Sequence, residues 1–417
     1  MADTAPDRSN SAVLDVDAVR RDFPILSETV YGKPLVFMDS GASAQKPRQV
    51  IDAMKNCMER QYSNVHRGAH YMSAATTDAF EQARDRVARF LNAATPDEIV
   101  FTANATASIN LVAHAYGRAF LKAGDEVVVS EMEHHANIVP WQLLAEATGV
   151  VLRVAPVEDD GSFSLDRFAA LLNERTKLVS ITHCSNVLGT TVPAKEVARL
   201  AHAAGAKVMF DGAQAVVHGP VDVQDIDADF YGFTAHKLYG PSGLGVLYGK
   251  LDILNSMPPF LGGGDMIDKV SFSGSTFKEA PHRFEAGTPA IVEVIGLHAA
   301  IDYVTDLGFD AIQAHEASLR DHAHARLAAI DGMRLIGTAP GKAAIISFLV
   351  DGLHPYDVAA VLDRQGVACR VGHHCAEPLM ERMGVIGTVR ASMALYNTLA
   401  EVDALAEAIE KARKMLA

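Results

Sequence analysis

Short apolar runs rich in β-branched residues recur along the first two thirds of the chain. They span residues 98–102, 126–130, 150–154, 178–182, 208–210, 228–233 and 245–248. Between them, stretches such as 109–120 and 194–204 carry apolar residues at helical spacing. This alternation predicts an α/β fold with a large, mostly parallel seven-stranded sheet that is covered by helices on both faces.

The periodicity changes in the last third of the chain. A long helical stretch runs to Leu327, and strand patterns follow near residues 344–350 and 388–393. The last helix opens with Thr398 and Glu401, which have the spacing of a capping box. The pattern predicts a smaller α+β domain at the C-terminal end.

These patterns divide the chain into three segments. Residues 1–22 are expected to form a polar tail and a short helix over 14–22, which packs on the small domain. Residues 23–299 are expected to form the large domain, and residues 300–417 the small one.

The composition is that of a soluble enzyme, with 417 residues, 49% hydrophobic and 21% charged. The 37 basic and 51 acidic side chains give a net charge of −14, which argues against binding to nucleic acid or acidic membranes. The N-terminus lacks the apolar core of a secretory signal, and no run approaches the roughly 20 apolar residues of a membrane span. A cytoplasmic location, with small molecules and proteins as partners, is therefore expected.

The four cysteines are scattered along the chain. None of them has the two-residue spacing of metal ligands, so neither a zinc site nor a disulfide framework is indicated, and no metal is expected. They are Cys57, Cys184, Cys369 and Cys375.

A lysine, Lys237, follows the apolar run 230–235 and precedes the breaker Gly240-Pro241. Pyridoxal-phosphate enzymes keep their Schiff-base amine in such a position. A strand-end lysine that reaches solvent would give the same local pattern. The interpretation gains weight from Asp211, which ends the apolar run 207–210 and would keep a pyridine nitrogen protonated, although a helix-capping aspartate is the alternative.

A phosphate cradle is indicated by Asn104-Ala105-Thr106-Ala107-Ser108, which lies between a predicted strand and a predicted helix. A plain N-cap by Thr106 is the alternative reading. Thr234 and His236, beside the lysine, are natural further donors to the same phosphate.

Two histidines, His134 and His135, follow the predicted strand 126–130. One imidazole could stack on a cofactor ring and move protons at neutral pH, although a surface histidine pair is the common alternative. Asn186 supplies an amide at the end of another predicted strand.

Two further residues lie in the predicted small domain. Cys375 is preceded by two histidines in a loop that begins at Arg370, and neighbouring imidazoles or an arginine can favour a thiolate, although an inert loop cysteine is the alternative. Arg390 lies inside an apolar strand, where it could bind a carboxylate with two hydrogen bonds or form an internal salt bridge.

Taken together, four motifs resemble class V, fold-type I pyridoxal-phosphate enzymes, and most closely the Suf-type (group II) cysteine desulfurases. The resemblance extends from about Phe23 to the last helix. The motifs are Asp211-Gly212-Ala213-Gln214, His236-Lys237-Leu238-Tyr239-Gly240-Pro241, Glu133-His134-His135-Ala136-Asn137 and Arg283-Phe284-Glu285-Ala286-Gly287-Thr288-Pro289.

The resemblance implies a role for each matching residue. The cofactor would be pyridoxal 5'-phosphate, with Lys237 as Schiff-base lysine, Asp211 at the pyridine nitrogen, Gln214 at the ring hydroxyl and His134 stacked on the ring. Phosphate ligands would be Thr106, Thr234, His236 and, from the neighbouring subunit of a homodimer, Thr288. Cys375 would form the persulfide, and Asn186, Arg370 and Arg390 would bind the substrate.

The chain departs from the family pattern at the phosphate loop. The family usually has Thr-Thr-Glu where this chain has Ala105-Thr106-Ala107, and the serine common at the position of Thr234 is replaced. One hydroxyl ligand and a nearby carboxylate are therefore missing.

The function that the resemblance implies is cysteine desulfuration. L-Cysteine would be converted to L-alanine, with the sulfur passed to Cys375 and then to an acceptor protein of the Suf system for iron-sulfur cluster assembly. The alternatives are a selenocysteine lyase, which shares all these residues, and a non-catalytic sulfur-transfer scaffold.

Overall fold

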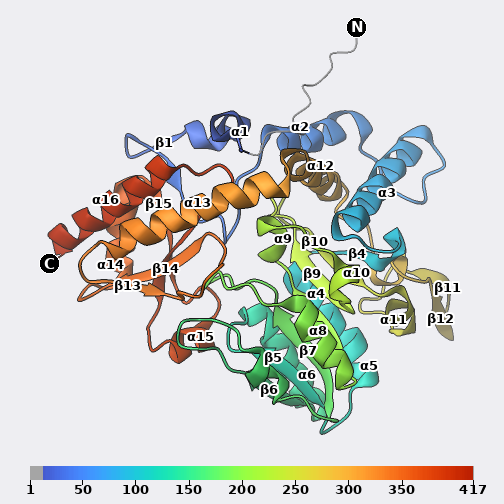
Figure 1. The fold of residues 1–417 in the computed structure, drawn as a ribbon. Helices are drawn as coiled ribbons and strands as arrows, with labels where there is room; N and C mark the ends of the chain where they lie inside the picture. The colour runs from blue at the N-terminus through green and yellow to red at the C-terminus, as the bar shows by residue number, and fades with distance from the viewer. Residues whose placement is uncertain (1–12, 417) are drawn as a thin grey trace.

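The computed structural model describes residues 13–416, so the predicted polar tail lies outside the described residues. Figure 1 shows a large α/β part and a smaller C-terminal part side by side. The large sheet has seven strands, and only β10 runs antiparallel to its neighbours. The predicted fold class is confirmed. In sheet order the strands are β4 (Ile99–Thr102), β10 (Gly245–Gly249), β9 (Phe230–Thr234), β8 (Lys207–Asp211), β7 (Thr176–Thr182), β5 (Glu126–Ser130) and β6 (Val151–Ala155).

Alternate side chains of the large sheet enter two separate cores. Val127 and Val129 contribute to one core and Val128 to the other, as the two-residue period of a strand requires. The first core includes apolar residues of α4 (Ala105–Leu111) and α6 (Val139–Thr148). The second core includes those of three longer helices, namely α3 (Tyr71–Leu91), α8 (Ala194–Ala203) and α12 (Ile291–Leu307).

The smaller part has a four-stranded antiparallel sheet with its own core. Helices pack against this sheet and bury their apolar sides there. The strands, in sheet order, are β13 (Met333–Ile336), β14 (Ile345–Val350), β17 (Thr388–Ser392) and β16 (Arg370–Gly372), and the helices are α13 (Phe309–Ala328), α14 (Pro355–Arg364) and α16 (Leu399–Leu416).

The N-terminal segment contacts this C-terminal part. Arg20, in α1 (Val16–Asp22), lies 2.9 Å from the carboxylate of Glu401. Further on, β3 (Val36–Phe37) pairs in parallel with β15 (Val367–Ala368). The expected boundary at residue 23 thus places β3 in the large domain, although this strand pairs with β15 of the C-terminal part.

The remaining elements are short or lie at the edges of the molecule. They are β1 (Thr29–Val30), β2 (Lys33–Pro34), α2 (Arg48–Asn56), α5 (Arg118–Phe120), α7 (Leu165–Ala169), α9 (Ala215–His218), α10 (Val223–Ile226), α11 (Leu251–Ser256), β11 (Ile267–Ser271), β12 (Gly274–Phe277) and α15 (Glu377–Arg382), with short 3-10 or π-helical turns between some of them.

The long helical stretch predicted before Leu327 is two helices. Gly308 separates α12 from α13 with a φ of 81°, a conformation that glycine adopts without steric cost. The helix predicted from residue 109 begins earlier, at Ala105, because the Asn104 side chain accepts a hydrogen bond from the backbone N–H of Ala107.

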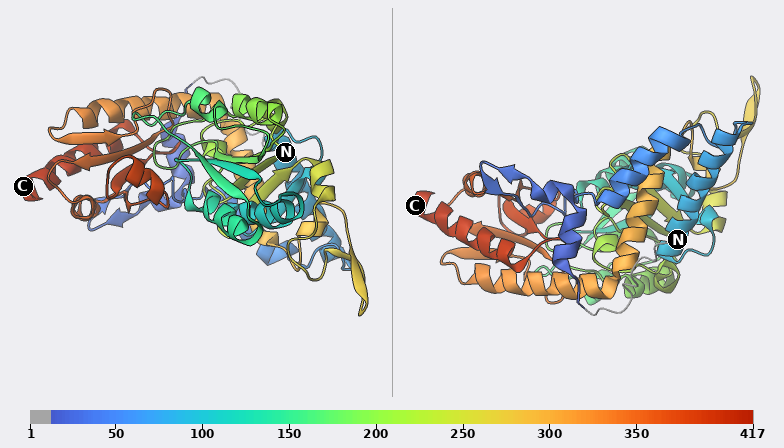
Figure 2. Two further views of the ribbon diagram at one scale, coloured as in Figure 1. Left: turned by 90° about the horizontal axis from the view of Figure 1, so that it is seen from below. Right: turned by 90° about the horizontal axis from the view of Figure 1, so that it is seen from above.

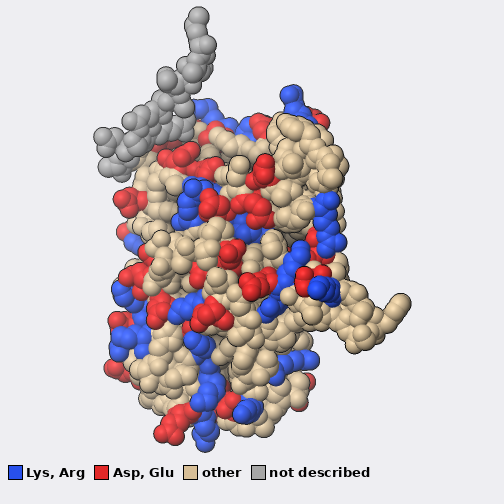
Figure 3. All heavy atoms as spheres, turned by 90° about the vertical axis from the view of Figure 1, so that its right-hand side faces the viewer, with Lys and Arg blue, Asp and Glu red and all other residues tan. Residues whose placement is uncertain are grey.

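The hairpin β11–β12 projects away from the body of the molecule in both views of Figure 2. Its side chains are largely exposed, and Phe272 at its turn is fully exposed. On the face drawn in Figure 3, charged side chains of both signs are interspersed, whereas the outer part of the projecting arm carries none. No helix within residues 13–416 is long and apolar enough to cross a membrane.

The capping box predicted for the last helix is present. The N–H of Glu401 donates to Thr398 Oγ1 at 3.2 Å, and the N–H of Thr398 donates to Glu401 Oε2 at 3.0 Å. We expect Thr398→Ala to lower the free energy of unfolding by about 0.5–2 kcal/mol, because the first turn loses a hydrogen-bond acceptor. Urea unfolding monitored by circular dichroism measures this loss. Thr148→Ala, which removes a hydroxyl bonded within its own helix, should change stability less.

Candidate active site

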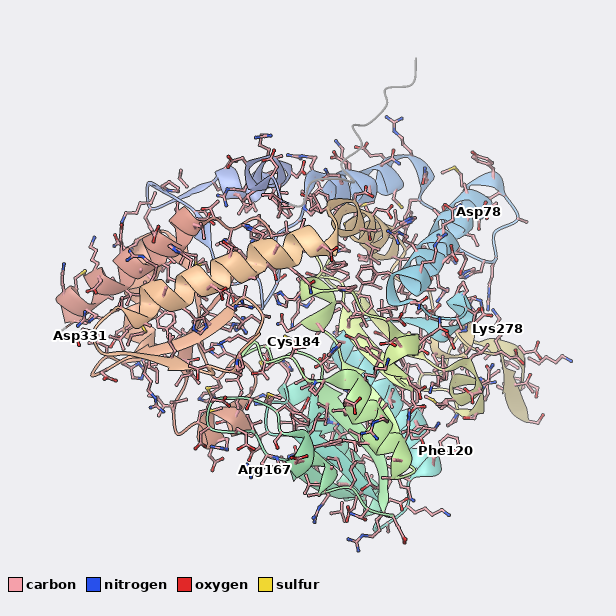
Figure 4. All side chains as sticks on the ribbon, viewed as in Figure 1. Asp78, Phe120, Arg167, Cys184, Lys278 and Asp331 are labelled. Atoms are coloured by element: carbon pink, nitrogen blue, oxygen red, sulfur yellow. The ribbon has the colours of Figure 1, made fainter. Side chains whose placement is uncertain are left out.

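A pocket lies where the two parts of the molecule meet, beyond the carboxyl ends of β7, β8 and β9. Cys184, labelled in Figure 4, marks its wall between the large sheet and the C-terminal part. The pocket brings together nearly all the predicted site residues, although they come from strands, loops and a helix that are far apart in the sequence. It is lined by Thr106, His134, Asn186, Asp211, Gln214, Thr234, His236, Lys237, Arg370, Cys375 and Arg390.

Thr288 is the predicted site residue that does not line this pocket. It is exposed, in the loop that precedes α12. The resemblance assigns this threonine to the pocket of a neighbouring subunit, so its role stays a prediction.

Lys237 and Asp211 lie at the ends of two adjacent strands, β9 and β8. Asp211 is buried, and burial raises the pKa of its carboxyl even though the Lys237 amine opposes this shift. Burial also lowers the pKa of Lys237 to about 8, with Asp211 opposing the shift and Arg390 adding to it. A side chain at Gly212 would come within 2.0 Å of the Tyr231 ring, so only glycine fits after the aspartate.

The low pKa of Lys237 predicts how the apoprotein takes up pyridoxal phosphate. Only the neutral amine attacks an aldehyde, so the rate should rise about tenfold per pH unit below pH 8 and level off above it. Stopped-flow absorbance over a pH series measures this rate. A rate still rising at pH 10.5, the ordinary lysine value, would contradict the assignment.

His134 presents a neutral ring to the pocket. Burial, helped by the positive charge of Lys237, lowers the pKa of this imidazole to about 4. Its Nδ1 accepts a hydrogen bond from the N–H of Ala136 at 3.0 Å, which fixes the ring. Behind it, Glu133 is fully buried and accepts hydrogen bonds from Asn137 Nδ2 and from the N–H of Thr182. Sequence reasoning missed Glu133 as a support because Thr182, 49 positions away on β7, comes close to it only in the folded chain.

The predicted phosphate side of the pocket differs in detail from expectation. The N-cap of α4 is Asn104, and Thr106 lies exposed in the pocket wall. The hydroxyl of Thr234 is buried and donates to the carbonyl of Leu244 at 3.2 Å. Burial and the charge of Lys237 lower the pKa of His236 to about 4, so its ring is neutral.

Arg390 is almost completely buried. It forms an internal salt bridge, which was one of the two alternatives that the sequence left open for this residue. Its Nη2 donates to Asp39 Oδ1 at 3.0 Å and its Nη1 to the carbonyl of Asn186 at 2.9 Å. The buried Nε has no partner within residues 13–416, so a donor remains for a ligand. Arg370 lies 3.9 Å from the other oxygen of Asp39. Asp39 comes from a distant part of the chain, and no sequence signal pointed to it.

The loop that carries Cys375 is held in an unusual conformation. His374 and Cys375 have φ values of 55° and 56°, in the left-handed region that side chains rarely adopt. The large domain holds the loop by two hydrogen bonds, from Asn186 Nδ2 to the carbonyl of His374 at 2.8 Å and from the N–H of His135 to that of Cys375 at 2.6 Å. His374 Nε2 also lies 2.8 Å from Thr388 Oγ1. The half-buried thiol is thus positioned within the pocket.

The other cysteines have settings that suit packing. Burial raises the pKa of Cys184 to about 12, although this thiol lines the pocket, and raises that of Cys369 to about 12 as well. Cys57 is buried in the core of the large part. Within the described chain, no three His, Cys, Asp or Glu side chains are grouped so that they could hold a metal ion.

Pyridoxal phosphate fits the donor set of the pocket. A deprotonable amine (Lys237), a buried carboxylate (Asp211) and a neutral imidazole (His134) are the groups that its aldehyde, ring nitrogen and ring face require. The Gln214 amide donates to the carbonyl of Gly41 at 2.7 Å, which directs this side chain along the pocket wall. Fold and site together define a pyridoxal-phosphate enzyme of fold type I.

The chain belongs to the class V aminotransferase family, and the sequence model of that family matches residues 36–405. It is 52% identical, over 96% of its length and 97% of the relative, to a cysteine desulfurase of Dickeya dadantii. It is 51% identical to a cysteine desulfurase of Synechococcus elongatus, of which it covers 63%. A crystal structure of a cysteine desulfurase from Escherichia coli in an S-sulfonic acid form superposes with a TM-score of 0.90 at 40% identity, covering 97% of this chain and 99% of that one.

Proposed function

We propose that the protein is a pyridoxal-phosphate-dependent cysteine desulfurase, which converts L-cysteine to L-alanine and retains the sulfur as a persulfide on Cys375. One observation carries the proposal. A thiol on a conformationally strained loop shares a pocket with a lysine of lowered pKa and with a buried arginine that has a free donor. The names of the relatives support the same reaction.

When bound, pyridoxal phosphate withdraws electrons from the substrate Cα and so stabilises the negative charge that forms there. Asp211 would hold its ring nitrogen in the protonated form, since a buried carboxylate needs a cation beside it. His134 would lie against the ring, and Thr106, Thr234 and His236 would hold its phosphate. Gln214 would donate to its ring hydroxyl.

The substrate is positioned through its carboxylate. The free Nε of Arg390 donates to one oxygen, while Asn186 and Arg370 complete the binding site. The Asp39 contact fixes the guanidinium before the substrate arrives, so binding loses less side-chain entropy. The Cα–H bond is thereby presented to Lys237.

Lys237 then acts as the base. With a pKa of about 8, its amine is partly neutral at physiological pH and accepts the Cα proton. The Cys375 thiolate attacks the substrate Sγ, so that an S–S bond forms while the Cβ–Sγ bond breaks. Lys237 returns its proton to the carbon fragment, His134 exchanges protons with it, and the fragment leaves as alanine. The sum is L-cysteine plus the Cys375 thiol giving L-alanine plus the Cys375 persulfide, which requires no external oxidant.

The persulfide must pass to another thiol before the next turnover. An acceptor protein of the Suf type, serving iron-sulfur cluster assembly, would take it from the half-buried Cys375. A homodimer is the proposed assembly, supported by the exposed Val270, Phe272 and Phe277 of the projecting hairpin and by the exposure of Thr288. Sedimentation velocity measures the assembly directly.

The test of the proposed function is product formation by the purified protein with pyridoxal phosphate. L-Cysteine with a reducing thiol should give alanine and sulfide in equal amounts. Absence of alanine from L-cysteine would overturn the proposal, and alanine from L-selenocysteine alone would favour the lyase.

A further inference from the structure

The pocket wall near Thr106 contains a polar side chain whose amide nitrogen has no role in the description above. Asn104 lines the pocket, and its Oδ1 accepts the hydrogen bond from the N–H of Ala107 at 2.9 Å. An oxygen must occupy that position, because the amide nitrogen is a donor and cannot accept. The Nδ2 group therefore takes no part in capping the helix, and the Asn104 side chain is exposed at the pocket wall.

The Nδ2 group of Asn104 is unpaired. Its two N–H donors have no hydrogen-bond partner among residues 13–416, whereas the main-chain carbonyl of Asn104 accepts from the Thr102 hydroxyl and from the N–H of Ser108. Gly245 packs so closely that a side chain there would come within 2.3 Å of the Asn104 backbone. The backbone of the residue is thus closely packed, and the hydrogen bond to Ala107 limits the rotation of its side chain.

The donors around this part of the pocket are few. Ala105 and Ala107 have no hydrogen-bonding side chain, and the Thr234 hydroxyl, which donates to the carbonyl of Leu244 at 3.2 Å, must turn from that carbonyl to reach a phosphate. The neutral Asn104 amide is thus one of the few side-chain donors beside Thr106. A phosphate dianion offers many acceptor oxygens, and hydrogen bonds to it are charge-assisted.

We propose that Asn104 is a phosphate ligand of the cofactor, its Nδ2 supplying the donor that Ala105 cannot. The inference rests on the proposed function, because it assumes that pyridoxal phosphate binds. It assigns to one side chain two tasks, capping α4 with its oxygen and binding the ligand with its nitrogen.

Two substitutions separate these tasks. Asn104→Asp and Asn104→Ser both keep a good N-cap, so the thermal unfolding midpoint of the apoprotein should stay close to that of the wild type. Both lose the amide donors, and the affinity of the apoprotein for pyridoxal phosphate should fall about tenfold or more, the scale of a hydrogen bond to a charged group. Absorbance titration of the apoprotein gives the dissociation constants.

Pyridoxal, which lacks the phosphate, is the matched control ligand. Its affinity should be the same for the wild type and for both variants, because the lost donors face the phosphate. Unchanged affinity for pyridoxal phosphate in either variant would overturn the inference. A loss of affinity in Asn104→Asp alone would not support it, because the new carboxylate repels the negatively charged phosphate. An equal loss for pyridoxal would overturn it too. If the wild-type apoprotein bound no pyridoxal phosphate, the proposed function itself would be contradicted.

Discussion

Replacing Cys375 by alanine should reduce the release of alanine from L-cysteine by about a thousandfold or more, the scale of losing a nucleophile. The remaining groups can still bind the substrate and remove its Cα proton, but no thiolate is present to take the sulfur. Visible absorbance should show that the cofactor remains bound through Lys237. Alanine and sulfide are measured with and without a reducing thiol.

The matched control is Cys184→Ala, in the same pocket wall. This thiol is buried, its pKa is raised to about 12, and its sulfur lies 3.6 Å from the carbonyl of Gly189. It therefore stays protonated, and its loss should leave turnover within about twofold of the wild type, as for a residue with no chemical role. Equal activity of Cys375→Ala and the wild type would disprove the persulfide mechanism.

The second large effect is expected for Lys237→Ala. The variant should lose the absorbance of lysine-bound cofactor, and its turnover should fall at least about a hundredfold to ten-thousandfold, the contribution of a positioned base. Absorbance of the reconstituted protein and alanine release provide the two measurements.

Lys342→Met is the control for the loss of a buried lysine. Burial lowers the pKa of Lys342 to about 8 as well, but its amine donates to the carbonyl of Gly337 and does not line the pocket. The control should retain the lysine-bound cofactor. If Lys237→Ala retained that absorbance as well, another amine would have to carry the cofactor.

Strand positions were predictable from the sequence because they depend on local patterns. The run 126–130 coincides with β5, and Asp211 and Lys237 lie at strand ends, where parallel sheets place their ligands. The 21-residue helix α3 was not predicted. Asp39 was not found either, because its partner Arg390 lies 351 positions away. Such contacts arise only when the chain has folded.

Contacts of the Cys375 loop were beyond sequence reasoning for the same reason. Its support comes from His135 and Asn186, each far from Cys375 along the chain. The family resemblance indicated the roles of Cys375 and Asn186, but not the hydrogen bond between Asn186 and the neighbouring carbonyl of His374.

The parallel pairing of β3 with β15 has a consequence for how the protein is made. Val36 and Met38 belong to the apolar core of the C-terminal part, together with Ile409 near the other end of the chain. A fragment comprising only residues 300–417 would therefore lack a strand and part of its core. During synthesis the segment 36–38 cannot pair until almost the whole chain has left the ribosome, so completion of the C-terminal part should be the last folding event.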